Sequence, residues 1–131
     1  MSVKLEEFLL FPEDIYRIGN STSHKLTAVR PFDVNTMVIN GVTMVIANGK
    51  GVSLYTIERI IQKQLTKFAW KFNKGTQVAP GLRLVSDEPQ HYMLAPMTNM
   101  PIDKYKGLLE EMGVRCGKYF HVKKGGILVR A

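Results

Sequence analysis

The sequence lacks the residues that would hold it together by disulfides or a metal. Among its 131 residues there is a single cysteine, Cys116, so no internal disulfide can form. The three histidines, His24, His91 and His121, stand far apart, and one cysteine offers no zinc spacing, so we expect no metal. These absences favour a protein that is made and folded in a reducing cytoplasm.

Long apolar runs and nucleotide-binding loops are also missing. No apolar run approaches the roughly 20 residues that cross a bilayer, so we expect no membrane insertion. The opening segment MSVKLEEFLLFPED is too acidic, and its apolar part too short, for a secretory signal. There is no Walker sequence and no G-x-G-x-x-G, so a nucleoside-triphosphate loop is unsupported.

What the chain does have is an ordinary apolar content and an excess of positive charge. Its length predicts one domain over residues 1–131, and 45% hydrophobic residues suit a globular core. The formal net charge is +7, which predicts attraction to something acidic. Nucleic acid, a dinucleotide and an acidic protein all satisfy that requirement.

Strand signals outnumber helix signals. Runs at 15–19, 82–86 and 90–96 read as strands, and Asn40-Gly41 between two β-branched runs predicts a hairpin over 36–47. A second hairpin is expected around the Lys123–Gly126 turn. Strands dominate, and the helices do not alternate strictly with them. This pattern predicts an α+β fold with a mixed or antiparallel sheet.

Two helices are expected. Apolar residues recur at three- and four-residue steps from 54 to 72, which predicts a long amphipathic helix with Ser53 at its start. The segment 101–112 predicts a second helix, because Pro101 opens it and Gly113 follows it.

The long predicted helix carries a row of positive charges at four-residue spacing. A solvated surface explains such a row, and so does a docking face for an acidic partner, because the repulsion within the row has no local remedy. We call this set the basic stripe; its members are Arg59, Lys63, Lys67 and Lys71.

Two short segments combine polar chemistry with glycine. Tyr16-Arg17 puts on an early strand a guanidinium suited to phosphate, although a surface arginine would look the same. Gly49 and Gly51 permit close approach of a ligand to the backbone, and Ser53 would lie where a helix presents free N–H groups. The alternative for Ser53 is an ordinary helix cap.

A third segment, EPQHYMLAPM, carries His91 and Tyr92 on a strand, where they point to opposite faces. An imidazole can donate, accept or shuttle a proton near neutral pH. A histidine with a purely structural role is the alternative.

The order of these segments resembles a known family. Tyr-Arg on an early strand, then GVSLYT, then GTQVAPGLRLVSDEPQHYMLAPMTNMPIDKYKGLL, is similar to the small ADP-ribosyltransferase-like toxins delivered by bacterial type VI secretion. The resemblance covers residues 14 to 112. It implies an ADP-ribosyltransferase-like fold with two small sheets that form a cleft for NAD.

The resemblance also implies roles for individual residues. Arg17 would contact a phosphate of NAD, Ser53 would support the nicotinamide ribose, and His91 would face the same cleft. The glutamate pair of many ADP-ribosyltransferases, Glu-x-Glu, is absent, and Glu88 is a weak substitute. The implied catalytic residues are Arg17, Ser53 and His91, and the implied cofactor-binding residues are Tyr16, Arg17, Ser53, Tyr55 and Tyr92.

The leading interpretation is an antibacterial toxin that acts in the cytoplasm on NAD, by ADP-ribosyl transfer or NAD hydrolysis. The resemblance implies a non-classical export route and a cognate immunity protein, which the charge of +7 predicts to be acidic. A basic ribonuclease-like or nucleic-acid-binding toxin, and a non-enzymatic partner-binding module, are the alternatives.

Overall fold

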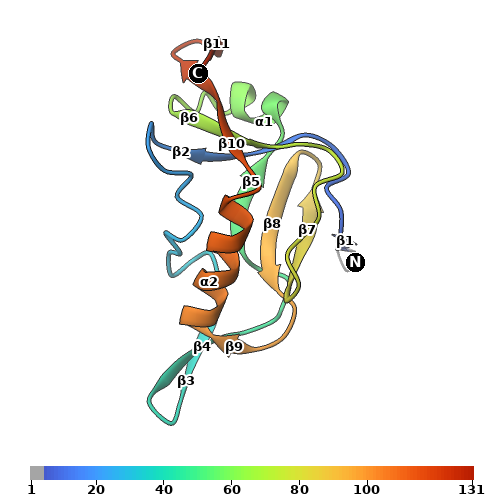
Figure 1. The fold of residues 1–131 in the computed structure, drawn as a ribbon, viewed down its shortest axis with the longest axis vertical. Helices are drawn as coiled ribbons and strands as arrows, with labels where there is room; N and C mark the ends of the chain where they lie inside the picture. The colour runs from blue at the N-terminus through green and yellow to red at the C-terminus, as the bar shows by residue number, and fades with distance from the viewer. Residues whose placement is uncertain (1–4) are drawn as a thin grey trace.

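The computed structural model describes residues 5–131 as strands with two helices (Figure 1). Residues 1–4, which belong to the expected domain and to the segment compared with secretory signals, lie outside the described part. The predicted α+β class is confirmed, and every strand pair within residues 5–131 is antiparallel.

The larger sheet has eight strands and places most of the predicted site residues. β7 (Leu82–Glu88) and β8 (His91–Pro96) form a hairpin beside β5 (Val52–Tyr55), and β2 (Ile15–Gly19) joins β5 to the strands at the other end. In spatial order the strands are β1 (Glu6–Phe8), β7 (Leu82–Glu88), β8 (His91–Pro96), β5 (Val52–Tyr55), β2 (Ile15–Gly19), β6 (Phe68–Phe72), β10 (Gly117–Lys123) and β11 (Ile127–Arg130).

The larger sheet is divided into two halves at the junction of β5 and β2. These strands are in register at one pair, Tyr16 opposite Tyr55, whereas β2 pairs with β6 along its whole length. Figure 1 shows β5, β7 and β8 running along the long axis, with β2 and β6 lying across them. Residues at the end of β5 therefore lie where the two halves meet.

The smaller sheet contains β3 (Thr36–Ile39), β4 (Val42–Val45) and β9 (Met100–Pro101). The predicted Asn40-Gly41 turn is confirmed, since both residues have positive φ, 51° and 78°. The second helix, α2 (Ile102–Gly113), has the predicted position, and β10 and β11 form the predicted C-terminal hairpin.

The expected continuous helix over 54–72 is wrong. The segment forms the end of β5, then α1 (Ile57–Gln62), then β6. Gln64 has a φ of +52°, which a helix cannot contain, and the apolar residues that follow also fit the two-residue period of a strand. Pairing of β6 with both β2 and β10 overrides the local helical pattern.

This correction also breaks up the basic stripe. Arg59 lies in α1 and Lys63 caps its C-terminus, whereas Lys67 precedes β6 and Lys71 lies within it. The four side chains therefore do not share a helix face.

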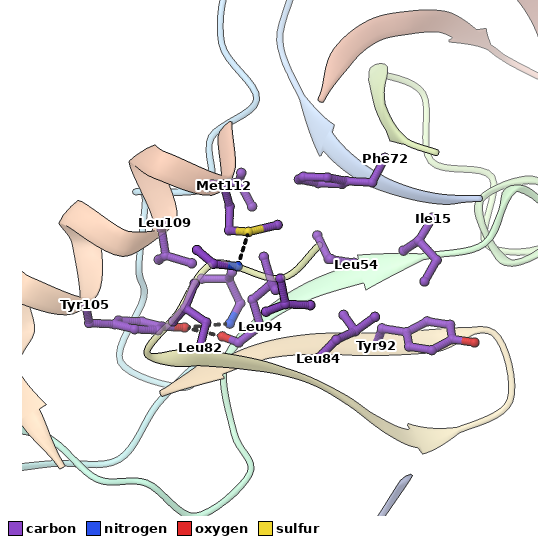
Figure 2. Packing of buried hydrophobic residues seen from close by; sticks show 14 of the residues in the cluster. Ile15, Leu54, Phe72, Leu82, Leu84, Tyr92, Leu94, Tyr105, Leu109 and Met112 are labelled. Carbon is purple, nitrogen blue, oxygen red and sulfur yellow. Dashed lines mark hydrogen bonds between the residues drawn. The ribbon is translucent and has the colours of Figure 1, made fainter. Parts of the chain in front are cut away.

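The main core lies between α2 and the sheet (Figure 2). Tyr105, Leu109 and Met112 project from α2 toward leucines of β5, β7 and β8, and all three are fully buried. The Tyr105 hydroxyl donates to the Leu94 carbonyl at 2.6 Å and accepts from the Val52 N–H at 3.2 Å. These bonds fix α2 to the two strands that carry the predicted histidine and serine.

Neither helix within residues 5–131 combines the length and apolar character needed to cross a membrane.

Candidate active site

Ser53 and His91 lie on neighbouring strands and are brought together by the register of β5 and β8. Tyr55 stands opposite His91 and Ser53 stands opposite Met93, so the three polar side chains share one face. The distance from His91 Nε2 to Ser53 Oγ is 3.0 Å, which is a hydrogen bond. Two residues that are 38 positions apart in sequence thus form one polar pair.

A third residue, Asp87, was not among the predicted site residues. Its Oδ1 lies 2.6 Å from His91 Nδ1, so His91 bridges Asp87 and Ser53. The register of β7 against β8 shifts between Ser86 and Glu88, and a bulge of this kind re-aims a side chain. The sequence signal was an aspartate four residues before a histidine across a tight turn.

Glu88, the weak substitute for the missing Glu-x-Glu pair, forms its hydrogen bond with a residue outside the Ser53–His91 pair. Its Oε1 accepts a hydrogen bond from Arg59 Nη2 at 2.7 Å. Oxygen and nitrogen atoms of Asp87, Glu88 and His91 lie within 4.8 Å of one another, a spacing open to a metal ion. The carboxylates already have protein partners, and the expected absence of a metal stays a prediction.

Tyr55 forms a wall beside the histidine. Its ring centre lies 5.3 Å from that of His91, and Lys63 Nζ lies 5.9 Å from the Tyr55 ring centre. Ser53, Tyr55 and His91 are each half-buried, so the pair is held by the strands yet reachable from solvent. The arrangement can accept a proton, donate one and offer an aromatic surface to a ring.

A hollow of about 530 Å³ adjoins this pair at Asp87. Four carboxylates contribute to its wall, so it has the opposite charge to the chain as a whole. Its lining residues are Glu6, Phe8, Glu13, Ser86, Asp87, Glu88, Pro89, Gln90 and Tyr92.

Arg17 is placed differently from Ser53 and His91. It alternates with Tyr16 along β2, so it points to the face opposite the one on which Tyr16 meets Tyr55. Its Nη1 donates to the Ser53 carbonyl at 2.8 Å and its Nη2 to the Lys25 carbonyl at 2.7 Å. Burial lowers the pKa of its guanidinium, an effect that Asp33 opposes. The predicted phosphate contact stays a prediction.

Tyr16 and Tyr92, two of the three tyrosines predicted to bind the cofactor, are also buried. Tyr92 lies in the main core and its hydroxyl donates to Glu13 at 2.6 Å. Tyr16 lies in a second apolar cluster, where burial raises its pKa to about 12. Tyr16 stands opposite Tyr55, and Tyr92 lines the hollow at Asp87. Their predicted roles in binding the cofactor are untested.

The expected position of Ser53 at a helix N-terminus is wrong. Helix α1 begins at Ile57, and its cap is Thr56, whose hydroxyl accepts from the Arg59 N–H at 3.4 Å. Gly51 allows a close approach of two backbone segments of the protein, rather than the approach of a ligand that the sequence suggested. A Cβ at this position would lie 1.9 Å from the Leu94 carbonyl oxygen. The glycine lets β5 approach β8 closely, which sets the spacing of Ser53 and His91.

Antiparallel sheets, two helices and a polar pair where the sheet halves meet are consistent with an ADP-ribosyltransferase-like toxin domain. The family model of the Tse2 ADP-ribosyltransferase toxins matches residues 13–118, which is most of the chain. The chain belongs to that family. A comparison with curated proteins found no match.

Proposed function

We propose that this toxin uses NAD as its ADP-ribose donor and that Ser53 and His91 contact the nicotinamide ribose. The observation that carries the proposal is the 3.0 Å hydrogen bond between Ser53 Oγ and His91 Nε2 on adjacent strands. Polar groups held rigidly at this spacing can orient a ribose and stabilise the charge that develops as nicotinamide leaves.

The surroundings of the pair support the proposal. The Tyr55 ring beside His91 gives the nicotinamide or adenine ring a surface for stacking. The Lys63 ammonium lies 5.9 Å from the Tyr55 ring centre and would favour the negatively charged pyrophosphate of NAD, whereas Arg59 is paired with Glu88. Membership of the ADP-ribosyltransferase toxin family makes NAD the natural donor.

Induced expression in bacteria tests this function against its alternatives. We expect cellular NAD to fall before growth stops, with RNA intact, and Ser53→Ala and His91→Ala proteins of equal abundance to leave NAD unchanged. Loss of RNA with NAD constant would favour the nuclease alternative. Growth arrest with neither loss would favour a partner-binding module.

We further propose that the toxin is delivered by type VI secretion, acts in the cytoplasm of the target cell, and is neutralised by an acidic cognate immunity protein. The formal charge of +7 supports an acidic partner. Lys63 and Arg59 are the stripe residues beside the site, whereas the Lys67 carbonyl is bonded to the Val122 N–H in the other half of the sheet. An immunity protein that covers the site would contact Lys63.

Two charge reversals test the position of this partner. With the immunity protein identified as the gene product that rescues growth, we expect Lys63→Glu to slow association and to weaken its salt dependence. Lys67→Glu is the matched control, because it changes net charge equally. Equal effects of the two variants would show that only total charge matters.

A further inference from the structure

The bridge from Asp87 through His91 to Ser53 defines where the imidazole proton resides. A carboxylate only accepts hydrogen bonds, so Asp87 at 2.6 Å holds the proton on His91 Nδ1. In the neutral ring Nε2 is then an acceptor, and the Ser53 hydroxyl donates to it across 3.0 Å. A base oriented by a third group and bonded to a hydroxyl is the arrangement that activates a serine.

We propose that Ser53 is a nucleophile that takes ADP-ribose onto its own side-chain oxygen, a step that rests on the proposed use of NAD. Ser53 Oγ bonds to C1′ of the nicotinamide ribose, and the C1′–N bond breaks with its electron pair going to nicotinamide. The hydroxyl proton passes to His91 Nε2, and the Asp87 carboxylate stabilises the resulting imidazolium. Charge balances, because cationic nicotinamide leaves neutral while His91 becomes positive.

The covalent adduct is resolved by a second displacement. Water or an acceptor hydroxyl bonds to C1′ as the C1′–O bond to Ser53 breaks, and the leaving Ser53 oxygen takes back the proton held by His91 Nε2. The proton of the attacking hydroxyl is released to solvent, which accounts for the one proton that the overall reaction sets free. Two displacements at one carbon retain its configuration, as in glycosidases that use a covalent intermediate. Direct attack on NAD would invert it.

The exposures in the bridge allow a reagent to reach it. The His91 side chain is 14% exposed and that of Asp87 is 36% exposed, and Ser53 is half-buried. Asp87 acts through His91 and is a positioning residue, while Ser53 and His91 are the groups that would touch the ribose.

Serine reactivity without NAD tests the activated hydroxyl separately from the proposed function. We expect diisopropyl fluorophosphate to label Ser53 in the full chain, as located by peptide mass spectrometry. Asp87→Asn should slow labelling roughly 10²- to 10⁴-fold, because an amide can donate to Nδ1 and move the ring proton to Nε2. Asp87→Glu should restore part of the rate.

A control and a spectroscopic readout separate this role from general damage. Ser21→Ala is the matched control, since Ser21 is exposed in the loop that follows β2, and this variant should label at the wild-type rate at Ser53. Nitrogen-15 spectra should show His91 protonated at Nδ1 in wild type and at Nε2 in Asp87→Asn. If Asp87→Asn leaves both the His91 tautomer and the labelling rate of Ser53 unchanged, Asp87 does not position His91.

Incubation with NAD tests the transfer step. We expect Ser53 to gain the mass of one ADP-ribosyl group, and methanol added as acceptor to give a product with retained configuration at C1′. NAD consumption with an inverted product, or with Ser53 unreactive toward both reagents, would overturn this inference while the proposed function stands. Labelled Ser53 without any NAD consumption would overturn the proposed function and the transfer step together.

Discussion

The two faces of the β5–β8 strand pair differ in nearly every physical respect. One face carries Ser53, Tyr55 and His91, which are half-buried and joined by a side-chain hydrogen bond. The other carries Leu54 and Leu94, both fully buried against the core. Alternation along a strand puts these sets within a few ångströms of one another yet in separate environments.

Arg17 shows what this difference means. The resemblance to the toxin family groups it with Ser53 and His91, but its guanidinium bonds two backbone carbonyls. A residue that satisfies buried carbonyls stabilises the fold, whereas a hydroxyl bonded to a reachable imidazole is available for chemistry. We therefore expect substitutions on the two faces to separate into losses of activity and losses of stability.

The largest effect is expected on the polar face. Ser53→Ala and His91→Ala should each lower nicotinamide release by roughly 10²- to 10⁴-fold, the range for loss of a proton-transfer group. Urea unfolding should change little, since each residue is half-buried. If both variants are folded and fully active, Ser53 and His91 are not part of the active site.

Arg17→Met should mainly lower stability. It leaves the Ser53 and Lys25 carbonyls without their donor, and we expect the free energy of unfolding to fall by roughly 2–4 kcal/mol. Activity per folded molecule should be close to wild type. Unchanged stability with weakened NAD binding would instead support the phosphate contact predicted from the sequence.

Gly51→Ala should perturb both faces, because it alters the spacing of the strands themselves. The added Cβ would lie 1.9 Å from the Leu94 carbonyl oxygen, so β5 must move away from β8. We expect a loss of about 1–3 kcal/mol in unfolding free energy, together with reduced activity. Gly107→Ala, where a Cβ meets no atom within 4 Å, is the matched control.

The smallest effect concerns pH. Burial lowers the pKa of His24, and the charge of Arg17 lowers it further, while Glu110 opposes them. His24 therefore binds a proton more readily in the unfolded state than in the folded state. The stability of the fold relative to the unfolded state is accordingly highest when His24 is neutral in both states, and it falls as the pH drops below about 6.5. His24→Gln should flatten the fall in unfolding free energy between pH 7 and pH 5. Parallel profiles would show that His24 is not its source.

Several strands and turns were predictable because their signals are local. Asn40-Gly41 marks its turn through the positive φ that these residues tolerate, and α2 was found from Pro101 and Gly113. The segment 54–72 could not be divided from its own pattern. Its apolar residues fit both periods, and pairing of β6 with β2 and β10 decides between them.

The candidate site was predictable in its residues but not in its connections. The resemblance names Ser53 and His91, but their contact depends on the register of β5 and β8. Asp87 was missed because a bulge directs it to His91, and the sequence does not mark that bulge. The resemblance places Arg17 beside them, but no local pattern in the sequence says which face of the sheet its side chain occupies.

A titration of isotope-labelled protein with NAD, followed by NMR, tests the central claim most directly. The account predicts saturable shifts for the His91 imidazole and for the amides of Ser53 and Tyr55, with the Leu109 and Met112 methyl groups of the core unchanged. Saturable binding that shifts residues elsewhere and leaves His91 and Ser53 unmoved would contradict it.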